Sequence, residues 1–266
     1  MESRITTKIK LDVNKKEINR FLFKMYTVDS SGKTLDETEY DSESNVVCKR
    51  IYRYFDTGEV KEYIEYDPSD ELLERHSYTK NELGEFDRHE FEFADGKKSI
   101  KEFAFTDIGN ADKATITDEN GYITGFEVYV LDDQSQTKEE IELDSENNEI
   151  AKYVKTYNEN GTLKLEKLYR GGVLFTEESF EYDEKGNVVK KIHTNYLDSF
   201  KVIDNYQFDL NNNMIYNSSH QNGVLVFENK CGYDEKNNLV SEEFFELDFW
   251  EKRIVLHERL LHELKK

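Results

Sequence analysis

The segment SFEYDEKGNVVKKI, Ser179–Ile192, has the residue order of a β-hairpin. Phe180 and Tyr182 alternate with polar residues, and a period of two is typical of a strand with one apolar side. Asp183 can accept backbone hydrogen bonds two residues further on, and Gly186 supplies the positive φ that a tight loop needs. A β-branched pair then starts the return strand. The segment therefore predicts a strand, a loop of about five residues and a second strand.

The same pattern recurs along nearly the whole chain, as an aromatic or apolar anchor followed by Asp or Asn, two variable residues, and Gly or Asn. The anchors are Val28, Tyr40, Tyr54, Tyr66, Thr117, Leu143, Tyr157, Tyr182, Phe208 and Tyr233. The last four anchors are separated by 25, 26 and 25 residues. A fixed period between about 20 and 50 residues indicates a repeat architecture.

These repeats predict an all-β fold of antiparallel hairpins that form an elongated, twisted meander sheet of roughly 16 to 20 strands. Pro68, the single proline, falls inside a predicted turn, as a sheet requires. No Pro- or Ser-rich linker divides the chain, so residues 1–249 are expected to form one array. The alternative is a closed barrel or a two-sheet sandwich, because an open single sheet leaves an apolar face in water.

The end of the chain has a different pattern. The segment FWEKRIVLHERLLHELKK, beginning at Phe249, has no turn signal and places five apolar residues among charged ones, namely Ile254, Leu256, Leu260, Leu261 and Leu264. Terminal units of repeat arrays are commonly atypical because they cover the last repeat. We therefore expect residues 250–266 to form an amphipathic helix that caps the array within the same domain.

The composition indicates an acidic protein with its apolar area in a few large side chains. The chain has 36 basic and 57 acidic residues, a net charge of -21, together with 17 Tyr and 17 Phe. Such a charge disfavours nucleic-acid and anionic membrane partners, and it favours a basic partner or high solubility. The aromatic residues favour a folded chain with a thin aromatic core over a disordered one.

The two cysteines, Cys48 and Cys231, have neither metal-ligand spacing nor the pattern of a disulfide framework. The first ten residues lack the apolar stretch of a signal peptide, and no apolar run approaches transmembrane length. We expect a cytoplasmic location, with the loss of a native leader peptide as the alternative.

Two stretches partly resemble metal-binding motifs. In HERLLHEL, His257 and His262 are five residues apart, so on a helix they diverge, unlike the pair of a His-Glu-x-x-His zinc motif. A calcium loop starting at Asp118 would need a glutamate where Tyr129 stands. The sequence therefore predicts no catalytic residues, no cofactor and no metal, and it does not predict an enzyme.

The unit Tyr-Asp-x-x-Gly-Asn-Val at Tyr182–Val188 resembles the YD repeat of bacterial Rhs-type proteins, and it is similar to variant MORN-type hairpin repeats. The resemblance covers roughly residues 26 to 245. Rhs-type proteins wind many such repeats into a shell around a toxic domain, whereas this chain is short and has no toxin-like domain after the repeats. The resemblance implies a hairpin array, and small repeat proteins of this kind occur as immunity or antitoxin partners of toxins.

Three functions follow as expectations. The first is a non-enzymatic protein-binding module, most specifically an immunity protein that neutralises a basic bacterial toxin by direct binding. The second is a structural or self-associating scaffold. The third is a carbohydrate binder or an enzyme that uses a concave aromatic surface. The oligomeric state stays open.

Partner-binding residues are expected where the repeat is irregular. Acidic candidates come from the stretch around residues 132–140, and apolar candidates from the end of the array. The candidates are Asp132, Asp133, Glu139, Glu140, Phe249 and Trp250.

Overall fold

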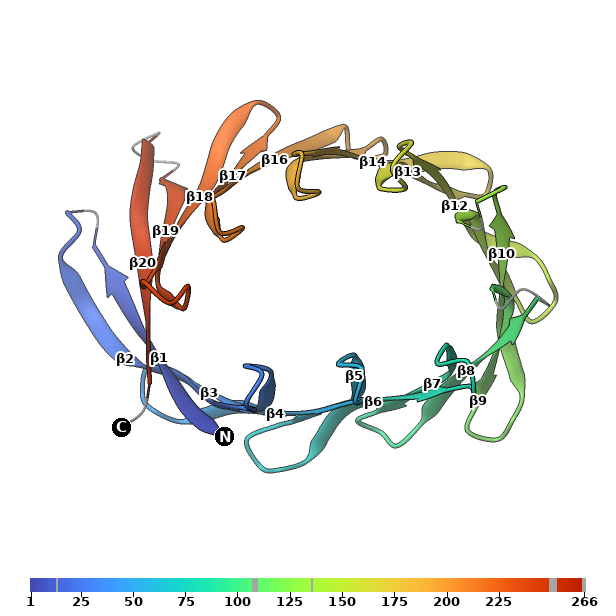
Figure 1. Ribbon diagram of the computed structural model, residues 1–266, viewed down its shortest axis with the longest axis horizontal. Helices are drawn as coiled ribbons and strands as arrows, with labels where there is room; N and C mark the ends of the chain where they lie inside the picture. Colours follow the sequence, from blue (N-terminus) through green and yellow to red (C-terminus); the bar gives the residue numbers. More distant parts are fainter. Residues whose placement is uncertain (13, 107–109, 135, 249–252, 265–266) are drawn as a thin grey trace. The chain divides into compact units, whose positions relative to one another are not determined.

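The computed structural model describes residues 1–12, 14–106, 110–134, 136–248 and 253–264, which form twenty β-strands and no helix (Figure 1). The first ten strands are β1 (Glu2–Leu11), β2 (Glu17–Val28), β3 (Thr34–Tyr40), β4 (Val46–Tyr54), β5 (Val60–Tyr66), β6 (Leu72–Lys80), β7 (Phe86–Phe93), β8 (Lys98–Phe105), β9 (Ala111–Asp118) and β10 (Ile123–Leu131). The second ten are β11 (Thr137–Asp144), β12 (Glu149–Tyr157), β13 (Leu163–Arg170), β14 (Val173–Tyr182), β15 (Val188–Asn195), β16 (Phe200–Phe208), β17 (Met214–Gln221), β18 (Val224–Tyr233), β19 (Leu239–Asp248) and β20 (Arg253–Leu264). The predicted all-β fold is confirmed.

The first and last strands of the chain pair with one another. β1 pairs antiparallel with β2 on one side and with β20 on the other, and β20 also pairs with β19 (Figure 1). Neither β1 nor β20 is therefore a free edge of the sheet, which removes a template for unwanted strand pairing. The prediction of an open meander is therefore wrong. The pairing of β1 with β20 forms the closed arrangement, which was predicted as the alternative.

The predicted helix over residues 250–266 does not form, because residues 253–264 are strand β20, while 250–252 and 265–266 lie outside the described residues. Four of the five apolar residues that suggested a helix, all except Leu261, occupy even-numbered positions, so they also fit a period of two. Backbone partners decide between the two patterns. Phe245 of β19 lies opposite Leu256, and Lys8 of β1 lies opposite Leu260, so β20 is paired on both sides.

The recurring aspartate organises many of the turns, as predicted. In the turn at Asp183, its Oδ1 accepts the backbone N–H groups of Lys185 and Asn187, each at 2.9 Å. Its backbone carbonyl accepts the N–H of Gly186, which has φ of +89°. The side-chain amide of Asn187 donates to Asp183 Oδ2 at 2.9 Å, and this bond, with the backbone donors, lowers the pKa of Asp183. The turn at Asp183 is thus a closed hydrogen-bonded loop of five residues.

Successive turns also contact one another in steps of the repeat. Asn187 Nδ2 donates to Asn212 Oδ1 at 2.6 Å, and Asn211 Nδ2 donates to Asn237 Oδ1 at 3.0 Å. Asn212 and Asn237 themselves hold positive φ, which asparagine tolerates better than most residues. In the turns at residues 183–187, 209–213 and 234–238, asparagines therefore shape the turn and join it to its neighbour.

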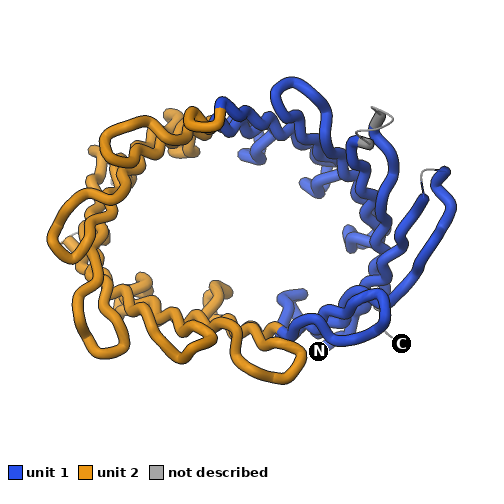
Figure 2. Tube along the Cα trace, turned by 180° about the vertical axis from the view of Figure 1, so that it is seen from behind, with its two compact units in different colours: residues 1–49, 180–194, 199–266 blue, residues 50–179, 195–198 orange. Residues whose placement is uncertain are grey.

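The chain divides into two compact units (Figure 2). The first unit comprises residues 1–49, 180–194 and 199–266, and the second comprises residues 50–179 and 195–198. Within each, the apolar residues that are fully covered are few and mostly small. They are Ile9, Val28, Cys48, Ile64, Ala114, Ala151 and Leu256. The predicted aromatic core is thus replaced by aromatic side chains that lie half-buried along the sheet.

Candidate functional site

The acidic candidates Asp132 and Asp133 lie in the turn between β10 and β11. Asp132 Oδ1 accepts the backbone N–H groups of Gln134 and Gln136, both at 2.9 Å, so Asp132 has the turn role of the other repeat aspartates. Asp133 is exposed beside it. The turn is therefore less irregular than the sequence suggested.

The other two acidic candidates are ion-paired along the strands. Glu139 lies 2.8 Å from Lys152 Nζ, and Glu140 lies 2.9 Å from Lys155 Nζ. As neighbours in a strand, the two glutamates project from opposite sides of the sheet. The four acidic candidates are therefore not brought together into one site.

The apolar candidates Phe249 and Trp250 lie outside the described residues, so that part of the expected binding site stays a prediction.

Strands β10 to β13 of the second unit carry an apolar surface, which we call the apolar face. Its residues are Ile123, Phe126, Val128, Val130, Ile141, Leu143, Ile150, Val154, Leu165 and Tyr169. Val128 lies opposite Ile141 near its centre. Ile123, Val130 and Ile150 are exposed at 48%, 40% and 54%. Half-buried residues such as Phe126 and Val128 lie between Ile123 and Val130 along β10, and apolar surfaces of this kind are typical of interaction sites.

The opposite side of the same strands carries a network of hydroxyl and ionic groups. The hydroxyl of Tyr129 donates to the carboxylate of Glu127, which also pairs with Lys101 of β8. Burial, followed by the contact with Glu127, raises the pKa of Tyr129, so this hydroxyl stays protonated and donates. Lys155 bridges Glu140 and Glu166 at 2.9 and 3.7 Å. The two sides of β10–β13 therefore differ: the Tyr129 side carries this network, and the apolar face carries most of the aliphatic side chains together with the ion pair of Lys152 and Glu139.

Strands β4 to β7 have the reverse distribution. Their aromatic side chains form a row on the side that carries Tyr129, which we call the aromatic ladder. Its members are Tyr52, Tyr63, His76, Tyr78, His89 and Phe91. The other side of this region carries ion pairs such as Arg75 with Glu92 at 3.2 Å and, at the β7–β8 pair, Lys98 with Glu90 at 2.6 Å. Aromatic pairs of this spacing stabilise a sheet through cross-strand contacts.

Two histidines meet at the centre of the aromatic ladder. His76 Nδ1 lies 3.0 Å from His89 Nε2, and the His89 ring stacks on Tyr78 with centroids 4.5 Å apart. A hydrogen bond between two imidazoles requires at least one neutral ring as acceptor. Burial lowers the pKa of His89, with further contributions from His76 and from Lys101 opposite it. The pair therefore disfavours a second proton.

A hydroxyl, an imidazole and a carboxylate join three strands where β1 meets β20 in the first unit. Thr6 Oγ1 lies 2.9 Å from His262 Nδ1, and His262 Nε2 lies 3.0 Å from Glu242 Oε1. A hydroxyl nucleophile needs such a base and orienting group. Thr6 is only 2% exposed, however, and a reacting hydroxyl must reach its substrate. The arrangement therefore has a structural role: its hydrogen bonds connect β1, β20 and β19.

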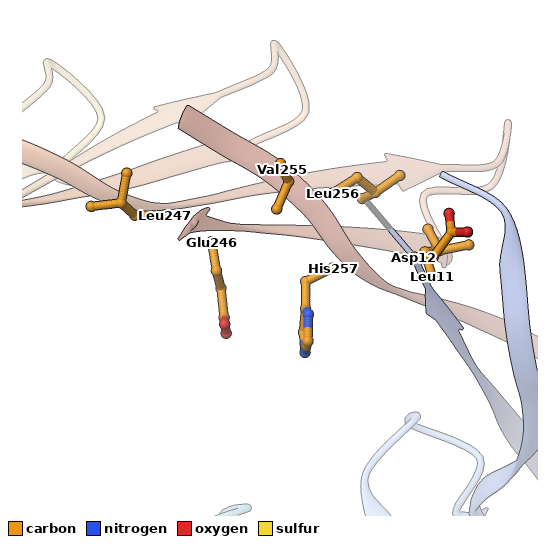
Figure 3. A pocket seen from close by; sticks show the side chains of 7 residues that line it. All are labelled: Leu11, Asp12, Glu246, Leu247, Val255, Leu256 and His257. Atoms are coloured by element: carbon orange, nitrogen blue, oxygen red, sulfur yellow. The ribbon is translucent and has the colours of Figure 1, made fainter. Parts of the chain in front are cut away.

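A pocket of about 190 Å³ lies at the other end of β20 (Figure 3). It is lined by Leu11, Asp12, Glu246, Leu247, Val255, Leu256 and His257. The side chains of Glu246 and His257 extend in the same direction in Figure 3, away from the apolar lining residues. Asp12 belongs to a turn, where its Oδ1 accepts the N–H groups of Asn14 and Lys16. Of the polar groups that line this small, open pocket, only the Glu246 carboxylate and the His257 imidazole take no part in the Asp12 turn. Two such groups are too few to define a reaction.

Among the described residues, no three His, Cys, Asp or Glu side chains are disposed to hold a metal ion. The described part of the chain also contains no helix of the length and apolarity that crosses a membrane.

The sequence reasoning missed the apolar face and the histidine pair. Alternation in ITGFEVYVL, residues 123–131, gave a signal for the first, because Phe126, Val128 and Val130 share one side of a strand. His76 and His89 are thirteen residues apart, and only the register of the β6–β7 hairpin brings them together.

No protein-family model and no curated protein matches the sequence. Several solved structures resemble the chain weakly. The crystal structure of TcdB2-TccC3-TEV has a TM-score of 0.33 and 11% identity, and the match covers 91% of this chain but 16% of that one. TcdB2-TccC3 without its hypervariable C-terminal region has a TM-score of 0.30 and 12% identity, over 95% of this chain and 18% of that one.

A porin-like protein from Bacteroides uniformis has a TM-score of 0.39 and 8% identity, over 99% of this chain and 96% of that one. The chain thus spans less than a fifth of the TcdB2-TccC3 structures.

Proposed function

We propose that this chain is a non-enzymatic protein-binding module whose partner docks on the apolar face of β10–β13. The observation that carries the proposal is the exposure of Ile123, Val130 and Ile150 on one side of these strands. The charged side chains on that side are largely neutralised by one another, as in the pair of Lys152 with Glu139. A partner can therefore cover the face without leaving many unpaired charges in the interface.

The more specific form of the proposal is an immunity protein that binds a basic bacterial toxin. The net charge of -21 supports it, because a negative field speeds the encounter with a basic protein. The YD-like turns, from Tyr182–Val188 onward, add the resemblance to repeats of toxin systems. In this account the net charge attracts the partner, and the apolar face supplies the contact that holds it.

The test is capture of the partner from the lysate of the native cell by three tagged proteins. The wild type should capture one stoichiometric basic protein, most of it released in high salt. The double variant Val130→Glu with Ile150→Glu should lose it. Leu83→Glu adds a carboxylate at an apolar residue that is 76% exposed in the β6–β7 turn, and it should retain the partner. Equal capture by all three proteins would contradict docking on the apolar face.

The immunity step is tested separately, by expressing the captured protein alone, with the wild type and with the double variant. Growth arrest that only the wild type relieves is the expected result. A partner without any toxic effect would contradict the immunity form while leaving the binding module in place.

Self-association is the second candidate, since the same apolar face could cover its copy in another molecule. It predicts a concentration-dependent mass in light scattering that Val130→Glu with Ile150→Glu abolishes and Leu83→Glu preserves. A monomer at all concentrations would exclude it.

A further inference from the structure

Strands β17 and β18 of the first unit carry two asparagines directly opposite one another. The register pairs Asn217 with Asn229, and Asn229 in turn with Phe244 of β19. Directly opposed residues have Cβ atoms about 4.5–5.5 Å apart and side chains on the same side of the sheet. The two amide groups are therefore within reach of one shared ligand atom.

Both amide oxygens are buried and lack a hydrogen-bond partner among the described residues. Asn229 as a whole is only 5% exposed. Its nitrogen is directed at Cys231 Sγ, 3.6 Å away, which leaves its oxygen as the free group. A buried carbonyl oxygen without a donor is unfavourable, so two at one position indicate that a donor belongs there.

The surroundings select the kind of donor. The rings of Phe227 and Phe244, with centroids 6.1 Å apart, lie on the same side as Asn229. Glu242, opposite Cys231, adds a carboxylate that is shared with His262. Lys230 projects from the other side of the sheet, where it lies over Phe245, so it does not fill the position. Two acceptors, two rings and a nearby negative charge favour a small cation that carries N–H groups on an alkyl stem.

We propose that Asn217 and Asn229 form an acceptor site for a primary ammonium group, such as a lysine side chain. Two N–H groups of the ammonium donate to the two amide oxygens, and the alkyl stem packs on Phe227 and Phe244. Guanidinium fits less well, because its donors diverge in a rigid plane. The site lies in the first unit, so it does not depend on docking at the apolar face of the second.

The competing arrangement has the Asn229 amide rotated by 180°. Its nitrogen would then donate to Asn217 Oδ1, and its oxygen would accept the thiol of Cys231, so the pair would satisfy itself. Side-chain amide orientation is measurable, because the NH₂ protons of Asn229 lie near Cys231 in one form and near Asn217 in the other.

The test is an NMR titration of the side-chain amide signals with n-butylammonium chloride, with n-butanol and sodium chloride as matched neutral and ionic controls. The signals of Asn217 and Asn229 should shift saturably with n-butylammonium alone. Those of Asn148, whose amide is bonded within a turn, should not move. Asn217→Leu should abolish the shift at Asn229, and Asn217→Asp should tighten binding several-fold, because a charged acceptor binds ammonium more strongly.

A lysine-containing tripeptide with blocked ends separates the two sources of the ammonium group. Binding of the tripeptide at least as tight as that of n-butylammonium would identify a polypeptide lysine, and binding of n-butylammonium alone would identify a free amine. Equal responses to n-butylammonium and n-butanol, or proximity of the Asn229 NH₂ protons to Asn217, would overturn the proposal. If Asn217→Leu does not fold, the wild-type titration and Asn217→Asp still decide it.

Discussion

Two regions, the part of β4–β8 that lies in the second unit and β10–β13 of the same unit, are built from the same hairpin repeat but distribute their side chains in different ways. In β4–β8 the aromatic ladder occupies one side of the sheet, and ion pairs such as Lys98 with Glu90 occupy the other. In β10–β13 the first side carries the ionic network around Tyr129, and the second carries the apolar face.

The difference teaches that turn geometry and surface chemistry vary independently in this fold. Asp67 and Asp144 make the same turn contacts, each accepting two backbone N–H groups through Oδ1 at 2.8 Å. The strands that follow the two turns nevertheless present different surfaces. The repeat therefore sets the position of each strand, while the residues between the turns decide which side of the sheet carries the apolar surface.

The largest expected effect is a loss of folding stability when a side chain is added in the tightly packed β10–β11 region. A methyl group at Gly125 of β10 would lie 2.7 Å from the backbone oxygen of Leu143, which cannot move without disturbing β11. We expect Gly125→Ala to destabilise folding by about 2–3 kcal/mol in urea unfolding. Amide hydrogen exchange should accelerate in β10–β12 and stay unchanged in β6–β7.

Gly232→Ala is the matched control for that substitution. Its new methyl group would meet Ser241 Oγ at 2.6 Å, and this hydroxyl can rotate away. We expect a loss of less than about 1 kcal/mol. A loss for Gly125→Ala as small as the one expected for Gly232→Ala would show that the close approach of β10 to β11 does not constrain this region.

A smaller effect concerns pH and should appear only in the aromatic ladder. The pKa of His89 is lowered in the folded state from the reference value of 6.5, which applies to the unfolded chain. Below pH 6.5 the unfolded chain therefore binds more protons than the folded chain. The histidine contribution to stability is therefore full above that pH, and it is lost as the pH falls through the folded pKa. Glu74, 3.8 Å from His76 Nε2, and Lys101, opposite His89, are the charged groups that face the pair.

Urea unfolding of the wild type and of His89→Phe between pH 7.5 and 5.5 measures this contribution. The variant keeps a ring in the ladder but has no group to protonate, so its stability should decline less on acidification. Parallel pH profiles for the two proteins would refute a role for the pair.

The smallest effect concerns salt and compares the outer sides of the two regions. Lys98→Met removes a half-exposed ion pair, which is worth about 0.2–1 kcal/mol and is screened by added salt. Val128→Ala on the apolar face should cost about 1 kcal/mol at any salt concentration. Stability measurements in low and in about 1 M sodium chloride should therefore shrink the first loss and leave the second. A salt-independent loss for Lys98→Met would contradict the ionic assignment.

The repeat made the hairpins and their turns predictable, since Asp183, Gly186 and Asn187 act locally and their roles follow from their own chemistry. The strand at residues 253–264 was not predictable, because most of its apolar residues fit both periods and its pairing partner β1 lies at the other end of the chain.

The surface chemistry was also hard to predict from the sequence, because the contacts join residues on different strands. Glu139 and Glu140 looked alike in a chain rich in carboxylates, and only the register showed that each already has a lysine partner. Thr6 and His262 are 256 residues apart, so no local pattern could have joined them.

The most direct test of the account is hydrogen exchange of the chain with and without its captured partner. Docking on the apolar face predicts slower exchange in β10–β13, with residues 60–93 of β5–β7 unchanged. Protection confined to β5–β7, or to the turns alone, would contradict the central claim that β10–β13 forms the binding surface.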